Sequence, residues 1–212
     1  MRYILGGNYD AALRQIEGAK TGGTSGAELE NLRGLALMLE GRLDEAIASF
    51  DRALATDASL EAARYNRGLA RLRQKDLSRA ATDLEAVFAV ESSRYRADAA
   101  YHLAIARDRQ GRAADAESWL DRALALDPAL DAALLYAGML RERRGDLQAA
   151  GRAYLTYLEQ HPESPVALLR FGLSARKAGQ PGTAKKYLER VVAAAPDSIE
   201  AIEARKHLVM WE

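Results

Sequence analysis

Residues 27–60 read AELENLRGLALMLEGRLDEAIASFDRALATDASL, and this stretch decides the fold. Gly34 interrupts a run of helix-forming residues, where glycine costs about 1 kcal/mol relative to alanine. That cost makes sense where a second backbone comes very close, and we expect Ala46 to be the small partner across a helix pair. Gly41 separates the two runs, and the acids after it favour the positive end of a new helix. The stretch therefore predicts two short helices joined by a tight turn.

The same pattern recurs on both sides of this stretch. The alanine of the second helix recurs at Ala12, Ala46, Ala80, Ala116, Ala150 and Ala184, with intervals of 34, 34, 36, 34 and 34 residues. The small residue of the first helix recurs at Gly34, Gly68, Ala104, Gly138 and Gly172. Proline stops the second helix in three later copies, at Pro128, Pro162 and Pro196. Several series at one period indicate a repeat architecture.

This unit resembles the tetratricopeptide repeat, which has small residues at repeat positions 8, 20 and 27, a large one at 24 and proline at 32. The stretch DRALALDP at 121–128 is close to the family's usual wording. The resemblance implies an all-α fold, a right-handed α-solenoid of antiparallel helical hairpins. It divides the chain into a partial repeat with a flexible joint, five full repeats and a closing helix, at 1–26, 27–60, 61–94, 97–130, 131–164, 165–198 and 199–212.

Some positions depart from the family pattern. Lys75 replaces the turn glycine of the second full repeat, and two extra residues follow that repeat, so we expect a looser joint there. Tyr157 and Val191 replace the small residue at repeat position 27. Arginine stands at repeat position 11 in the three middle repeats, where an aromatic residue is usual; we expect their stems to pack and their charged heads to reach water, at Arg71, Arg107 and Arg141.

Charge and composition exclude several classes of protein. Thirty Lys and Arg balance thirty Asp and Glu, so the basic excess of a nucleic-acid-binding protein is missing. The chain has no cysteine, which excludes disulfides and thiolate metal sites. No apolar run is long enough to cross a bilayer, and the N-terminus lacks the features of a secretory signal. We expect a soluble protein, either cytoplasmic or periplasmic after removal of a leader.

The sequence shows no catalytic constellation. His102, His161 and His207 lie far apart and form no H-E-x-x-H pattern, so a metal site is not expected. The glycine-rich stretch at 22–26 lacks the lysine and the preceding strand that a phosphate-binding loop needs. We therefore expect neither enzymatic activity nor a cofactor.

The first helices of stacked hairpins line an inner wall, and repeat positions 2, 5, 6, 9, 12 and 13 share one stripe of each helix. Tyrosines, apolar residues and a row of cations fall on this stripe. The residues predicted to bind a partner are Tyr65, Asn66, Leu69, Arg73, Tyr101, His102, Ile105, Arg109, Tyr136, Met139, Arg143, Leu169, Arg170, Leu173 and Lys177. Such a surface suits an extended or helical peptide with apolar anchors and acidic residues. The alternative is that the apolar residues belong to the core and the arginines only complement the helix dipole.

The resemblance implies a protein–protein interaction module or an assembly scaffold. The Ala- and Arg-rich composition favours a bacterial source, where similar proteins often serve envelope assemblies. The alternative is a non-catalytic arm of a larger enzyme, such as a glycosyltransferase or sulfotransferase. The half helix at Met1 predicts a segment of a longer protein, and the apolar stretch 208–211 leaves self-association open.

Overall fold

The structure is a computed structural model that describes residues 25–209, and all regular structure within this range is helical. The predicted all-α fold class is therefore confirmed. The partial repeat and joint predicted at 1–26 lie outside the described residues except for the last two, and so do Met210 and Trp211. Within the described range, no helix is both long and apolar enough to cross a membrane.

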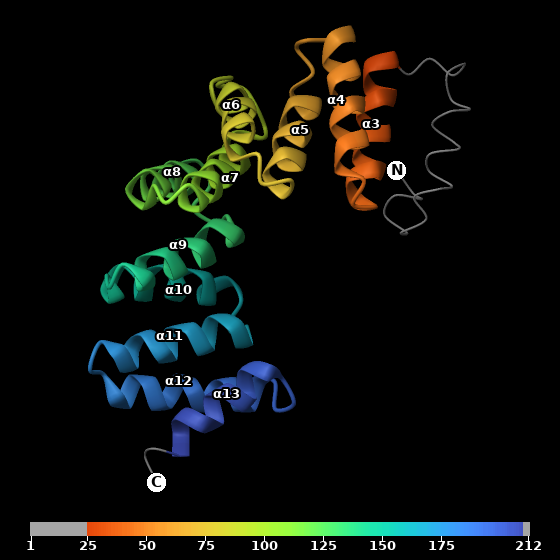
Figure 1. Cartoon of the computed structure of the whole chain (residues 1–212). Coiled ribbons are helices and arrows are strands. Elements are labelled where there is room, and N and C mark those ends of the chain that lie inside the picture. Colours follow the sequence, from red (N-terminus) through yellow and green to blue (C-terminus); the bar gives the residue numbers. More distant parts are fainter. Residues whose placement is uncertain (1–24, 210–212) are drawn as a thin grey trace. The chain divides into compact units, whose positions relative to one another are not determined.

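Contacts divide the chain into two compact units, residues 1–126 and 127–212. The first unit holds three antiparallel pairs (Figure 1): α3 (Gly26–Leu39) with α4 (Leu43–Thr56), α5 (Glu61–Arg73) with α6 (Leu77–Phe88), and α7 (Arg96–Arg109) with α8 (Ala113–Leu126). The second unit holds α9 (Asp131–Arg143) with α10 (Leu147–Gln160), α11 (Pro165–Lys177) with α12 (Pro181–Ala194), and the single helix α13 (Ile199–Leu208), which packs against α12. Each helix pair overlaps one predicted full repeat, and α3 and α7 begin one residue before the predicted starts at 27 and 97.

The turns within the pairs explain the recurring glycine. Gly41 has φ +84° and Gly145 has φ +82°, a left-handed conformation that glycine adopts without steric cost. The amide of Arg42 donates back to the carbonyl of Leu37 at 2.9 Å, which closes the end of the first helix. Lys75 adopts the same conformation with φ 66° although it has a side chain. The second full repeat therefore has the same turn geometry although lysine replaces glycine there.

The glycine within the first helix has a different neighbour from the one expected. A Cβ atom at Gly34 would lie 2.5 Å from Cε1 of Phe50, and the nearest atoms all belong to that ring rather than to Ala46. Ala46 is itself fully buried. The small residue at repeat position 8 therefore makes room for the large residue at repeat position 24. At Gly172, the carbonyl oxygen of Ala184 also lies 3.5 Å from the Cβ position, beside the Leu188 side chain. The prediction named the alanine and missed the large residue.

The buried interior follows the repeat. The large residues at repeat position 24 are all buried: Phe50, Leu84, Leu120, Tyr154 and Leu188. The alanines that defined the period are buried as well, at Ala46, Ala80, Ala116, Ala150 and Ala184. Serine side chains cap the N-termini of three helices, and at Ser25 the cap is a reciprocal capping box with Glu28. The helix pairs are thus fixed by buried small and large residues at set positions.

Candidate functional site

The first-helix face is the stripe of repeat positions 2, 5, 6, 9, 12 and 13 on α5, α7, α9 and α11. None of the predicted partner-binding residues on it is fully buried; each is half-buried or exposed. Such partial exposure is expected for a binding surface, and it is also expected for side chains at the edge of the hydrophobic core. The contacts that each residue makes decide how it is used.

In the first unit, the structure brings three predicted residues together around one imidazole. The ring of His102 lies 4.8 Å from that of Tyr101 and 5.9 Å from that of Tyr65, measured between centroids. Tyr65 also stacks on Tyr95 at 4.9 Å. Tyr95 was not predicted; it belongs to the two extra residues between repeats, and only its aromatic character was available as a signal. These four rings form an aromatic cluster on the first-helix face.

His102 is neutral in this cluster. Burial removes water from the imidazole, and Arg73 adds an unfavourable charge, so the pKa of His102 falls to about 4. Its Nδ1 atom is buried and has no hydrogen-bond partner among the described residues. Burial also raises the pKa of Tyr65 well above its usual range, with a smaller effect from Asp98. A neutral, partly enclosed polar ring can accept or donate one hydrogen bond to a bound chain.

The remaining predicted residues of this unit make internal contacts. Asn66 donates a hydrogen bond to the side-chain oxygen of Asn31 at 3.0 Å, which links two neighbouring first helices. Leu69 and Ile105 pack on buried core clusters beneath them. These residues therefore take part in packing between helices, whereas Tyr65 and Tyr95 of the aromatic cluster pack against a separate buried cluster.

The predicted row of cations has a structural use. Arg73 donates from Nη1 to the carbonyl of Met38 at 3.2 Å, and Arg109 does the same to the carbonyl of Leu72 at 3.3 Å. In both cases the carbonyl lies in the last turn of the preceding first helix and also accepts from a backbone amide of the following turn, Gly41 or Lys75. These two arginines therefore act as the dipole-complementing residues of the alternative interpretation, although both remain exposed.

In the second unit, α9 and α11 form a pocket of about 320 Å³. Its lining combines an aromatic ring, two apolar side chains and four charged groups, from Tyr136, Met139, Leu140, Glu142, Arg143, Arg170 and Lys177. Five of these seven were predicted as partner-binding residues. Leu169 and Leu173 do not line the pocket; they pack against the buried cluster below it. We call this site the α9–α11 pocket.

The charges of the α9–α11 pocket are unevenly matched. Glu142 accepts from Lys177 Nζ at 2.5 Å and from the hydroxyl of Tyr154 at 3.2 Å. Burial, and then the nearby Glu142 carboxylate, raise the pKa of Tyr154. Arg170 forms no ion pair within the described part of the chain. Arg170 is therefore a basic group of the pocket without an ion pair among the described residues, beside a lysine that is bound to Glu142.

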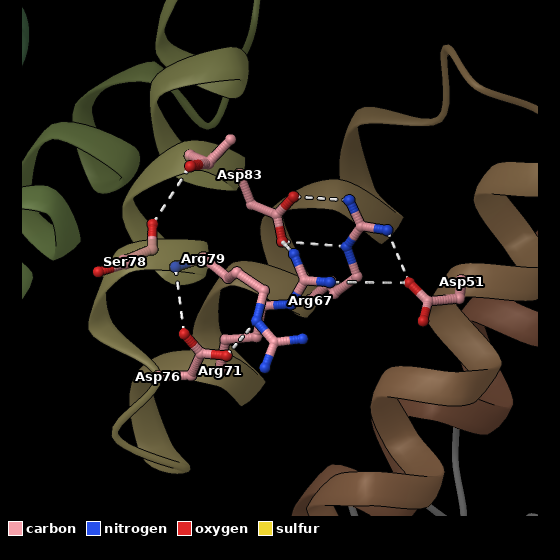
Figure 2. A network of polar contacts seen from close by, with 8 residues as sticks. Asp51, Arg67, Arg71, Asp76, Ser78, Arg79 and Asp83 are labelled. Atoms are coloured by element: carbon pink, nitrogen blue, oxygen red, sulfur yellow. Dashed lines mark hydrogen bonds and ion pairs between the residues drawn. The ribbon is translucent and has the colours of Figure 1, made fainter.

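Arginine at repeat position 11 behaves differently from the prediction. Arg71 donates to Asp83 Oδ2 at 2.7 Å, and Arg67 donates to both oxygens of the same carboxylate (Figure 2). Arg67 also reaches Asp51, on α4, at 2.7 Å. Arg107 similarly forms an ion pair with Glu85. The expectation that the charged heads of Arg71 and Arg107 reach water is wrong. Arg71 is bound by Asp83 and lies near Asp51, and Arg107 is bound by Glu85, so both guanidinium groups are largely buried. Asp51 and Glu85 both stand at repeat position 25 of the preceding repeat.

These acids are the functional groups that sequence reasoning missed. Asp51 and Glu85 recur at the same repeat position, which was a readable signal for a pairing with the arginines. Asp83 occurs once and gave no signal. No group of three or more possible metal ligands occurs among residues 25–209. The network joins α4, α5 and α6.

Comparisons with known proteins agree with this geometry. Sequence profiles described as TPR repeat match residues 34–75, and those described as tetratricopeptide repeat match residues 65–131, 132–164 and 166–198. A sequence search of curated proteins finds no significant match. The solved structures that resemble the chain include PilW, described as a widely conserved type IV pilus biogenesis factor, with a TM-score of 0.82 and 22% identity over 94% of this chain and 92% of that chain.

Two further structures are similar. YrrB, described as a TPR protein with an unusual peptide-binding site, has a TM-score of 0.67 and 23% identity over 93% of this chain and 99% of that chain. PilF of Pseudomonas aeruginosa has a TM-score of 0.79 and 20% identity over 97% of this chain and 92% of that chain. At such identities the likeness establishes the fold. Together with the profile matches across residues 34–198, it shows that the chain belongs to the tetratricopeptide repeat family.

Proposed function

We propose that the chain is an interaction module that holds a peptide segment of a partner protein on its first-helix face. The observation that carries the proposal is the α9–α11 pocket, which places Met139 and Tyr136 beside the basic groups of Arg143, Arg170 and Lys177. An apolar side chain fits the first two residues, and a carboxylate fits the cations. The partner segment is therefore apolar with neighbouring acidic residues.

The aromatic cluster of the first unit supports the same function independently. Tyr65, Tyr101 and His102 offer ring surface and one unpartnered nitrogen atom, which suit a bound backbone or side-chain amide. Tetratricopeptide repeats are protein-interaction modules, and the similar protein YrrB is described as having a peptide-binding site.

Two synthetic peptides test the proposal. Both carry the same apolar segment, one with flanking glutamates and one with flanking lysines. The acidic peptide binds, and its affinity falls as salt is raised because the exposed charges are screened. Arg170→Glu weakens its binding about tenfold or more, since an attraction becomes a repulsion.

A matched control separates the pocket from general charge. Arg79→Glu makes the same charge change on α6, where the side chain is 73% exposed, and leaves the affinity unchanged. Unaltered thermal midpoints of both variants establish that folding is intact. Equal binding of the two peptides, or equal loss in both variants, contradicts the proposal.

Within this function, we propose service in a bacterial envelope assembly. The support is the likeness to PilW and PilF over nearly the whole of both chains. The competing proposal is a non-catalytic arm that recruits substrate proteins to a larger enzyme. Cross-linking in the native organism followed by mass spectrometry distinguishes them: structural envelope components favour the scaffold, and substrates of one enzyme favour the arm.

Self-association is a separate proposal that rests on α13. This helix exposes Ile199 and Ile202, and Val209 follows it on the surface. Light scattering that reports a constant monomer mass over a wide concentration range contradicts it. A mass that rises with concentration, and falls back to the monomer in Ile199→Lys/Ile202→Lys, supports it.

A further inference from the structure

In the first unit, an arginine–acid pair connects the second helix of each repeat with the first helix of the next repeat. Arg71, at repeat position 11 of α5, lies 4.0 Å from the carboxylate of Asp51 on α4. Arg107, at the same position of α7, forms an ion pair with Glu85 on α6. Each arginine side chain thus spans the junction between the two helices and is largely buried there.

The junction between α10 and α11 lacks both members of this pair. Leu155 stands at the acidic position and is 37% exposed, and Ala175 stands at the arginine position. The result is a surface pocket of about 300 Å³ between the two helices. Its apolar lining comes from Leu147, Gly151, Leu155, Phe171 and Ala175. We call it the α10–α11 pocket.

Two polar groups of this pocket lack partners. Ser174 is 1% exposed, and its hydroxyl has no hydrogen-bond partner among residues 25–209. The corresponding residues of the first unit are Ala70 and Ala106, so packing does not require a hydroxyl here. Arg152 lines the same pocket, and its guanidinium forms no ion pair within the described residues. A buried hydroxyl without a partner is destabilising unless something binds it.

We propose that the α10–α11 pocket is a second binding site, which takes an apolar side chain of a partner protein that is followed by an acidic residue. The apolar side chain occupies the space that Arg71 and Arg107 fill at the other junctions. Ser174 donates a hydrogen bond to the partner's backbone carbonyl, and Arg152 pairs with the carboxylate. A cationic anchor does not fit, because no acid lines the pocket and Arg152 repels it.

This site is distinct from the α9–α11 pocket, because it uses other residues of α11 and the second helix α10 in place of α9. The inference therefore stands whether or not the first-helix face binds a peptide. It follows from one junction that departs at several positions from the arrangement of the other junctions in the same chain.

A synthetic peptide array on the intact protein tests the proposal. The peptides vary the anchor among leucine, phenylalanine, alanine and lysine, and the next residue between glutamate and lysine. Leucine or phenylalanine followed by glutamate binds best, and an alanine anchor weakens binding about tenfold or more. In NMR spectra of the labelled protein, the bound peptide shifts the amide signals of Gly151 and Ala175. A preference for the lysine anchor, or shifts confined to Tyr136 and Met139, overturns the proposal.

The most informative variant introduces the arginine–acid pair of the first unit into the α10–α11 junction. Leu155→Glu/Ala175→Arg introduces the pair that closes the junctions of the first unit, so the protein stays folded while the peptide no longer shifts the amide signals of Gly151 and Ala175. Ser174→Ala raises the thermal midpoint and weakens binding about fivefold, because it removes both an unsatisfied hydroxyl and a hydrogen bond to the peptide.

Arg79→Glu, which changes the same charge on exposed α6 and lines neither pocket, is the control and leaves the shifts of Gly151 and Ala175 unchanged. Unchanged shifts of these two amides in the double variant contradict the proposal. A second result also contradicts it: the wild-type protein does not bind the peptides but forms oligomers, and the double variant stays monomeric. In that case a second copy of the chain occupies the pocket.

Discussion

Gly138 lies in α9 against the ring of Tyr154, which is fully buried. All three atoms nearest to a Cβ at this position belong to that ring, and all lie closer than van der Waals contact allows. Gly138→Ala therefore forces the ring or the backbone to move, although alanine favours a helix. We expect a loss of about 1–3 kcal/mol in the free energy of unfolding, measured by urea denaturation.

Gly182 provides the matched control for this substitution. It lies in α12, and a Cβ there would meet no atom within 4 Å. Gly182→Ala should therefore stabilise the protein by about 0.5–1 kcal/mol through helix propensity alone. If both variants shift the urea midpoint in the same direction, the close packing of Gly138 on Tyr154 is not the cause.

His102 predicts a pH dependence of stability. Its pKa is about 4 in the folded protein against 6.5 for an unperturbed histidine, so the unfolded chain binds the extra proton between these values. Stability is complete above about pH 6.5 and declines as the pH falls toward 4, by up to about 3 kcal/mol. Urea denaturation of the wild type and His102→Phe across this range measures the difference. Parallel pH profiles of the two proteins contradict a buried neutral imidazole.

At the scale of the helix, α5 is held to its neighbours by charge as well as by packing. The Asp83 side chain is 4% exposed and accepts from Arg67 and Arg71 (Figure 2). Asp83→Asn keeps the shape but leaves two partly buried guanidinium groups without that carboxylate. We expect a loss of about 3 kcal/mol in the free energy of unfolding, because removing one partner of a buried pair leaves the other uncompensated.

The same figure contains a control for Asp83. Arg79 pairs with Asp76 on the surface of α6, and its side chain is 73% exposed. Arg79→Ala should change the unfolding free energy by less than about 1 kcal/mol, because exposed pairs contribute little. A loss at Asp83→Asn no larger than that of Arg79→Ala means that the network does not stabilise the helix junction.

The positions of the helices could be predicted from the sequence because the residues that start, end and pair them lie within each repeat. Gly41 marks a left-handed turn, and small and large residues at a fixed period mark the interface of each pair. Contacts between side chains were less readable. Spacing places Gly34 and Ala46 on facing helices, but the direction of the Phe50 side chain decides which atoms meet. Likewise, the long stem of Arg71 suggested a solvated head, whereas Asp51 and Asp83 hold that head inside.

The candidate site was readable in part for the same reason. Helical periodicity placed Tyr136, Met139 and Lys177 on one face, and they do line one pocket. Periodicity placed Glu142 on the same face as the row of cations, but it did not show that Lys177 is the cation it binds or that Arg73 donates to a carbonyl of the preceding repeat. Such contacts depend on how one repeat is positioned on the next, which a single-helix pattern does not contain.

At the scale of the whole molecule, stability should be local. Among residues 25–209, the helices of each unit make their extensive contacts with helices one or two places away in the order of the chain. The stability of such an array is approximately a sum of repeat terms and nearest-neighbour interfaces. A substitution in one repeat should then loosen that repeat and its neighbours more than distant ones.

Hydrogen exchange of the two destabilised variants tests this locality. Gly138→Ala should lower amide protection in α9, α10 and α11 by about tenfold or more, and should change α4 and α5 much less. Asp83→Asn should give the reverse pattern, with the largest effect in α5 and α6. The two variants thus serve as controls for each other, because they act in different units. If either variant lowers protection equally along residues 25–209, the chain unfolds as one cooperative block, and a partner held on one repeat would stabilise every other repeat as well.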